Sequence, residues 1–229
     1  MRRSNAALLA CAALAAAAFA PGAHAANVSE IGYPTAAPFP QADCPENCQA
    51  VAQLSGMQVK LGKSTNPFRI TKPGYIVAFT VRLAKPTAEQ VGFFKSTYGN
   101  TPSVRIGIVR SLKRQHKFRL YRQSPVMQVE KYFGSTPTFV LKNPLRATQG
   151  DIVVLTVPTW VPAFAHLLDD DFAWRSSHSG DDCTAQNPPA AVHDDIKSVR
   201  VYGCLYRTAR LLYSATFVAD PKVPKSSGK

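Results

Sequence analysis

The sequence lacks the short motifs by which many enzymes are recognised. It contains no Gly-x-Ser-x-Gly elbow, no His-Glu-x-x-His pair and no glycine-rich phosphate loop. These absences exclude the nucleophile elbow of α/β-hydrolases, the zincin metal site and P-loop nucleotide binding. Internal repeats are also absent, and no shift in composition divides the 229 residues, so we expect a single folded domain.

Apolar runs long enough to cross a membrane are absent after the first 25 residues. The longest uncharged stretch, residues 152–168, has only 17 residues and contains Pro158 and Pro162. A membrane helix needs about 20 apolar residues and tolerates interior prolines poorly. This stretch therefore predicts two strands joined by a turn, and we expect no transmembrane span in the mature chain.

Residues 1–25 have the pattern of a secretory signal peptide. Two arginines precede an apolar run, and Ala23-His24-Ala25 fits the cleavage rule for small residues. We expect cleavage before Ala26 and a secreted, extracytoplasmic protein. Two of the 27 basic residues lie in this leader and none of the 14 acidic residues does, which leaves 25 basic residues and a net charge of +11.

Cysteine usage agrees with export. Cys11 falls in the predicted leader, and an even number remains: Cys44, Cys48, Cys183 and Cys204. In an oxidising compartment four cysteines predict two disulfides, with three possible pairings. We favour the local pairing, Cys44 with Cys48 and Cys183 with Cys204, because each bond then closes a loop of its own segment. A zinc site is the alternative, but these spacings match no common zinc signature.

Short apolar alternations broken by Gly, Pro, Asn and Lys dominate the chain from residue 48 onwards. Examples are residues 57–61, 104–108 and 118–120, and β-branched or aromatic runs occupy 76–83 and 152–157. Helical periodicity is scarce. The pattern predicts an all-β fold, an antiparallel β-sandwich of jelly-roll-like type with about ten strands and one short helix.

The single predicted helix follows Thr87, whose side chain can cap it, with Gln90 at the capping-box position and Gly99 at its end. Residues 26–43 are rich in Ala and Pro, which predicts an extended lead-in and not a packed element. Residues 220–229 are expected to be a disordered basic tail. The β-sandwich domain is therefore expected to span residues 44–219.

Two stretches of the second half carry a further pattern. The turn Asn143-Pro144-Leu145 is followed by Gly150-Asp151 and the apolar run from Ile152 to Val157, and a strand-like segment from Tyr206 to Tyr213 comes later. Together they resemble the late part of secreted bacterial jelly-roll modules, which are carbohydrate-binding-like β-sandwiches. The resemblance covers about half the chain and implies the fold, but it transfers no functional residue.

A basic segment lies between residues 105 and 122 and contains seven Lys or Arg residues and no acid. We expect strands at 104–110 and 117–123 to pair, with Phe118 and Leu120 facing the core and the alternate residues facing outward. The predicted ligand-binding residues, which we call the basic strip, are Arg105, Arg110, Lys113, Arg114, Lys117, Arg119 and Tyr121. Arginine forks bind carboxylate or phosphate, and the ring of Tyr121 can stack on a sugar. The alternative is a solvated hairpin whose charges protect a sheet edge from aggregation.

Half of the acidic residues form an aspartate-rich region: Asp169, Asp170, Asp171, Asp181, Asp182, Asp194 and Asp195. Ca²⁺ binds clustered carboxylates on extracellular loops, but no EF-hand spacing occurs here. We favour ordinary loop aspartates that pair with the surplus of Lys and Arg. No cofactor is therefore expected, and Ca²⁺ at these loops is the alternative.

Catalytic arrangements are few. Ser177-His178-Ser179-Gly180-Asp181 places Ser, His and Asp in one loop, but sequence adjacency is not triad geometry. Trp160 lies among apolar residues and is expected in the core, and Trp174 in the core or at its rim.

Three hypotheses for function follow. The first is a non-catalytic module that binds carbohydrate or an anionic cell-envelope polymer through the basic strip. The second is an extracellular polysaccharide hydrolase or lyase, and the third is a structural or adhesive surface protein. Export argues against nucleic acid as the primary ligand of this basic chain.

Overall fold

The computed structural model describes residues 27–32, 39–113, 115–185 and 188–221. Within these residues the chain forms antiparallel sheets and one α-helix, which confirms the predicted all-β, sandwich-like fold. Ten of the fifteen strands have four residues or more, in agreement with the predicted number. The predicted signal peptide and residues 222–229 of the predicted tail lie outside the described residues.

The elements follow in chain order. They are β1 (Val28–Ile31), β2 (Val51–Leu61), β3 (Ser64–Thr65), β4 (Gly74–Val81), α1 (Ala88–Tyr98), β5 (Ser103–Ser111), β6 (Lys117–Gln123), β7 (Met127–Gln128), the 3₁₀ helix η1 (Glu130–Tyr132), β8 (Thr138–Ala147), β9 (Ile152–Val161), β10 (Phe164–Ala165), β11 (Phe172–Ser176), the 3₁₀ helix η2 (Gly180–Asp182), β12 (Val199–Val201), β13 (Cys204–Arg207), β14 (Arg210–Leu211) and β15 (Tyr213–Ala219).

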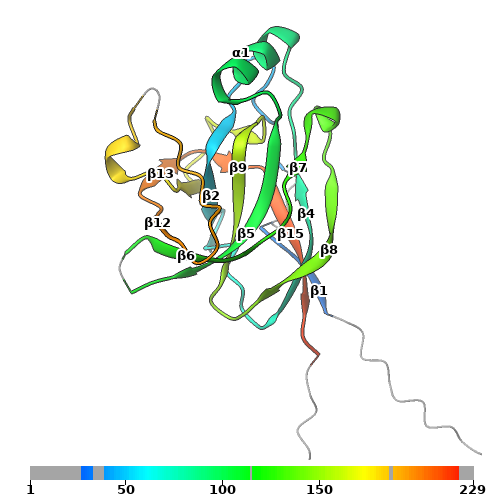
Figure 1. Cartoon of the computed structure of the whole chain (residues 1–229), viewed down its shortest axis with the longest axis vertical. Helices are drawn as coiled ribbons and strands as arrows, with labels where there is room; N and C mark the ends of the chain where they lie inside the picture. The colour runs from blue at the N-terminus through cyan, green and yellow to red at the C-terminus, as the bar shows by residue number, and fades with distance from the viewer. Residues whose placement is uncertain (1–26, 33–38, 114, 186–187, 222–229) are drawn as a thin grey trace, which may run out of the picture.

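Two sheets form the body of the molecule (Figure 1). The smaller has the order β1-β15-β4-β8, and the larger has the order β12-β6-β5-β9-β2-β11-β13. The short strands β3 and β7 pair with β2 and β5, and β10 pairs with β14. In Figure 1 the strands β12 and β13 lie on the opposite side of the molecule from β8, and α1 lies at one end.

The core lies between the two sheets and draws on both. Ile76 and Phe79 of β4 belong to the same buried cluster as Ile106 and Ile108 of β5. The Tyr213 hydroxyl of β15 donates to the carbonyl of Val153 in β9, at 3.1 Å. Each fully buried aliphatic or aromatic side chain contributes about 1.5–3 kcal/mol, so the alternating apolar pattern is the main stabilising feature of the sandwich.

The predicted helix is confirmed as α1. Thr87 is its N-cap, and Thr87 and Gln90 form the predicted capping box. The helix buries Phe94, whose ring lies 4.9 Å from that of Trp160. The Trp160 indole donates to the Gly99 carbonyl at 3.1 Å and the residue is fully buried, as predicted.

The stretch 152–168 forms two strands, β9 and β10, as predicted; Pro162 lies between them, and Pro158 lies within β9. In the described part of the chain, no helix has the length and apolar character to cross a membrane. Both predicted disulfides are present, Cys44 with Cys48 and Cys183 with Cys204.

Both ends of the domain differ from the prediction. The expected lead-in contributes β1, which pairs with β15 from Val28 to Ile31, and it buries Phe39. Four residues are too few to show an alternation, and the strand exists because β15 offers a free edge. At the other end Asp220, expected in the tail, forms an ion pair with Arg146.

Candidate functional site

The basic strip sits on the hairpin of β5 and β6. The two strands pair as predicted, with Arg110 opposite Arg119 and Val109 opposite Leu120. A register shift leaves Tyr121 at a bulge. Leu120 is fully buried and Phe118 packs edge to face on the ring of Tyr202, which confirms the predicted alternation of core and outer residues on β6.

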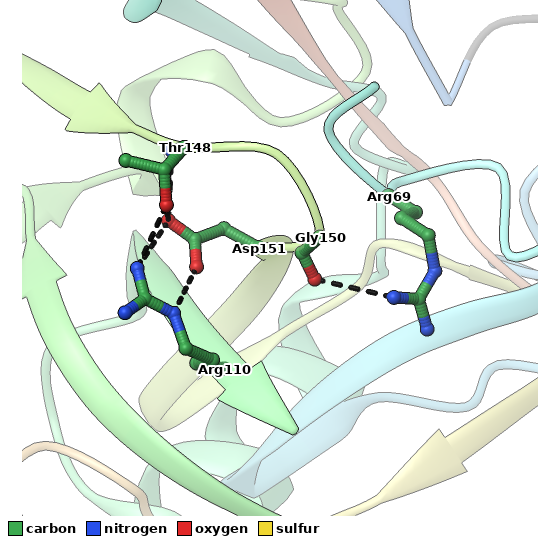
Figure 2. A network of polar contacts seen from close by, with 5 residues as sticks. All are labelled: Arg69, Arg110, Thr148, Gly150 and Asp151. Atoms are coloured by element: carbon green, nitrogen blue, oxygen red, sulfur yellow. Dashed lines mark hydrogen bonds and ion pairs between the residues drawn. The ribbon is translucent and has the colours of Figure 1, made fainter. Parts of the chain in front are cut away.

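Arg110 pairs with the carboxylate of Asp151, a residue that lies outside the hairpin of β5 and β6. Its Nε donates to Asp151 Oδ1 at 2.7 Å, and its Nη2 donates to Oδ2 at 3.2 Å and to the hydroxyl of Thr148 at 2.8 Å. Figure 2 shows Arg110 on one side of the turn at residues 148–151 and Arg69 on the other. Arg69 donates to the carbonyl of Gly150 at 3.3 Å, so this one turn positions two guanidinium groups.

Asp151 is the buried anchor of this turn, with 2% of its side chain exposed. Burial raises the pKa of its carboxyl, but hydrogen bonds from Arg110 and from the backbone and hydroxyl of Thr148 outweigh burial and hold the pKa below its usual value. The same contact raises the pKa of Arg110. The pair is therefore ionised in the folded protein, and the charge of Arg110 is locally compensated.

Two arginines of the basic strip, which the sequence predicted to be free for a ligand, are paired with carboxylates in the structure. Only 13% of the Arg105 side chain is exposed; it forms an ion pair with Asp194 at 3.1 Å, and burial lowers its pKa. The guanidinium of Arg110 lies 4.5 Å from the centre of the Tyr121 ring, so it occupies the face that we expected a sugar to use. Both carboxylates come from distant parts of the chain, which is why the acid-free segment gave no sign of them.

The remaining members of the strip keep their charges uncompensated. Lys113, Lys117 and Arg119 take part in no ion pair among the described residues. Arg114 lies outside the described residues. Lys113 and Arg119 are exposed, so the ligand-binding role of the strip stays a prediction for these residues.

A groove of about 620 Å³ opens beside the loop that joins β5 to β6. Its basic side chains come from three separate segments: Arg69, Lys113, His116 and Arg175. Its apolar lining comes from Met57, Val59, Leu112, Phe118 and Ile152, and the other lining residues are Thr65, Asn66, Ser111 and Gln115. We call this feature the cationic groove. No acidic residue is among the described residues that line it.

The guanidinium groups of the groove are held by backbone carbonyls. Arg175, opposite Met57 in the pairing of β11 with β2, donates to the carbonyls of Tyr202 and Gly203 at 3.3 and 3.2 Å. Burial, and then repulsion by Arg207, lower the pKa of Arg175. Carbonyl contacts fix the direction of a guanidinium without neutralising its charge, so both arginines remain available to an anion.

His116 completes the basic lining. Its backbone has a positive φ of 57°, and its carbonyl accepts from the backbone N–H of Tyr202 at 2.8 Å. Burial, and then the nearby charge of Arg175, lower the pKa of the imidazole. At neutral pH it is therefore a neutral hydrogen-bonding group, and an anion bound beside it would favour the charged form.

The aspartate-rich region is dispersed among separate contacts. Asp171 pairs with Lys60, Asp194 pairs with Arg105, and Asp182 accepts from the backbone and hydroxyl of Ser179. Across the described ranges no three His, Cys, Asp or Glu side chains are placed to hold one metal ion.

The Ser-His-Asp loop forms no triad within the described residues. Ser177 donates to the carbonyl of Ala191, and Nδ1 of His178 lies 3.1 Å from the hydroxyl of Ser176. Ser176, Ser177 and His178 are buried, whereas Asp181 is exposed, and the neighbouring carboxylate of Asp182 contacts Ser179. A nucleophile in this position would be out of reach of a polymer substrate.

Sequence reasoning missed two groove residues, Arg69 and Arg175. Each is a single base in an otherwise unremarked segment, and only the pairing of β11 with β2 and the bridge of Arg69 to Ile152 bring them to one place. Comparisons with protein-family models, with curated proteins and with solved structures give no match.

Proposed function

We propose that this protein is a non-catalytic module that binds an anionic polysaccharide of the cell envelope, and that the polymer binds in the cationic groove. The observation that carries the proposal is that Arg69, Lys113 and Arg175 line one groove and none of them pairs with a carboxylate in the described part of the chain. A guanidinium fork is well suited to uronate carboxylates and to phosphate diesters.

The apolar part of the lining favours a sugar polymer over a simple inorganic anion. Val59 and Leu112 are half-buried and contribute apolar surface to the groove next to the basic side chains. A sugar ring has a C–H face that packs on such surface, while its acidic group turns towards the cations. A uronate-containing polysaccharide satisfies both parts of the lining.

The compartment supports the same ligand class. Two disulfides are typical of proteins in an oxidising environment, and the predicted signal peptide points to export. Outside the cytoplasm a basic protein meets polyanions mainly as envelope and matrix polymers. A net charge of +13 for the full chain also favours their long-range attraction.

The test is a binding titration with polygalacturonate as the carboxylated polymer, teichoic acid as the phosphate polymer and dextran as the neutral one. We expect the protein to bind polygalacturonate with an affinity that falls as the salt concentration rises. We expect no binding of dextran in the groove. In the double variant Arg69→Gln with Lys113→Gln the affinity should fall about thirtyfold, since each solvent-exposed ionic contact contributes roughly 1 kcal/mol.

The matched control removes the same charge elsewhere. Lys85→Gln with Lys142→Gln changes two exposed lysines that do not line the groove and should leave the affinity within about twofold. A further pair, Lys117→Gln with Arg119→Gln, tests the exposed part of the basic strip. Equal losses in the groove variant and the control would mean that only net charge matters, and the proposal would then be abandoned.

A further inference from the structure

A second pocket has a volume of about 510 Å³, and its lining differs in residue type from that of the cationic groove. We call it the aromatic pocket. The start of β2, the end of α1, and strands β10, β11 and β13 meet there, and its rings come from Tyr98, Phe164, Trp174, His178 and Tyr206. Its size falls within the roughly 300–1,000 Å³ typical of small-ligand sites. The remaining lining residues are Gln49, Ala50, Val51, Ala52, Gln53, Leu54, Thr97 and Pro188.

The wall of the pocket contains a polar group without a partner. Trp174 is 4% exposed, and its indole Nε1 has no acceptor among the described residues. An unsatisfied buried donor costs about 1–3 kcal/mol, so each such group in a native protein calls for a physical explanation. The other tryptophan, Trp160, is satisfied by the Gly99 carbonyl. Of the two tryptophan indoles, the one without a partner is therefore the one that lines the aromatic pocket.

The aromatic walls are held in place by packing and by a disulfide. Trp174 stacks on Tyr206 with ring centres 4.5 Å apart and meets the ring of Phe164 edge to face. The Cys183–Cys204 bond ties β13 to the loop that carries His178. Gly203 also donates to the His178 carbonyl at 2.9 Å. Rigid walls of this kind lower the entropy lost on binding.

We propose that the aromatic pocket binds a neutral sugar ring of an oligosaccharide, independently of the cationic groove. No Asp, Glu, Lys or Arg is among its described lining residues, which selects an uncharged ligand. Ring faces pack against the C–H face of a pyranose, and the amides of Gln49 and Gln53 can bond to its hydroxyls. The Nε1 of Trp174 is itself covered, so a sugar oxygen can accept its hydrogen bond only when the neighbouring side chains move aside.

The test uses the indole N–H signals of the ¹⁵N-labelled protein, because the chain has only two tryptophans. The probes are cellotetraose, xylotetraose and chitotetraose, each titrated to millimolar concentration. We expect at least one of them to shift the Trp174 indole signal and to leave that of Trp160 in place. Benzyl alcohol serves as a control ligand that has an aromatic ring but no sugar. If none of the three oligosaccharides shifts the Trp174 indole signal, or if benzyl alcohol alone shifts it, the proposal is overturned.

Two variants locate the response. Tyr206→Leu keeps apolar volume but removes the stacking ring, and it should weaken sugar binding about tenfold. Tyr75→Leu removes a half-exposed tyrosine of the smaller sheet and should leave binding unchanged. The groove variant Arg69→Gln with Lys113→Gln should also bind the neutral sugar normally, so that failure of either site is recognised separately. Unchanged affinity in Tyr206→Leu would overturn the assignment to this pocket.

Discussion

The substitution Asp151→Asn tests the turn that positions Arg110 and Arg69. Oδ2 of Asp151 accepts three hydrogen bonds and Oδ1 accepts one, all from Thr148 and Arg110. An asparagine oxygen can replace Oδ2, but its amide then faces the Nε of Arg110, donor against donor. One charge-assisted bond is lost, which is worth about 1.5–3 kcal/mol. Water reaches the half-exposed Arg110, so the loss in unfolding free energy should be about 2–3 kcal/mol and not larger.

The pH dependence gives a second readout. The pKa of Asp151 is lower in the folded protein than its ordinary value, so the folded state binds fewer protons than the unfolded state. The stabilisation is therefore complete above about pH 4 and is lost as the pH falls through the lower folded pKa. The difference between the native protein and Asp151→Asn should be largest at pH 7 and should shrink below about pH 3.

The assay is urea unfolding at both pH values, followed by circular dichroism. Asp171→Asn is the matched control, because Asp171 also pairs with a basic side chain, that of Lys60, but is 57% exposed. An exposed ion pair contributes about 0.5 kcal/mol or less to the free energy of unfolding. If Asp151→Asn were no more destabilising than this control, the buried turn would not anchor the two arginines as described.

Two further predictions concern residues 183–204. His193 is buried, and burial lowers its pKa, so the stabilisation from the neutral side chain is present above about pH 6.5 and is lost as the pH falls through the folded pKa. In His193→Gln the thermal unfolding temperature should therefore depend less on pH over that range. An unaltered pH profile would contradict this prediction. Replacing Cys183 and Cys204 by serine should lower the unfolding free energy by about 3 kcal/mol in urea, because the bond closes a loop with a sequence separation of 21 residues. A loss near zero would mean that the loop is ordered without the bond.

Features of the fold that depend on neighbours in sequence were predictable. The capping box of Thr87 and Gln90 involves only four consecutive residues, and the alternation around Leu120 involves only seven. Both disulfides followed from pairing cysteines inside one segment. β1 was missed because it has no such local pattern: its pairing with β15 joins opposite ends of the domain. Local chemistry therefore predicts elements, while edges of sheets are filled by whichever segment the topology brings to them.

The candidate site shows the same limit in its charges. A basic surplus is visible in composition, but the sequence does not say which bases will be neutralised by acids that fold back onto them. Asp151 and Asp194 remove Arg110 and Arg105 from the predicted strip. Because 27 bases face only 14 acids, a surplus must remain uncompensated somewhere on the folded chain. Arg69 and Arg175 are held by backbone carbonyls at one groove without a carboxylate partner, and this arrangement supports the proposed binding of an anion there.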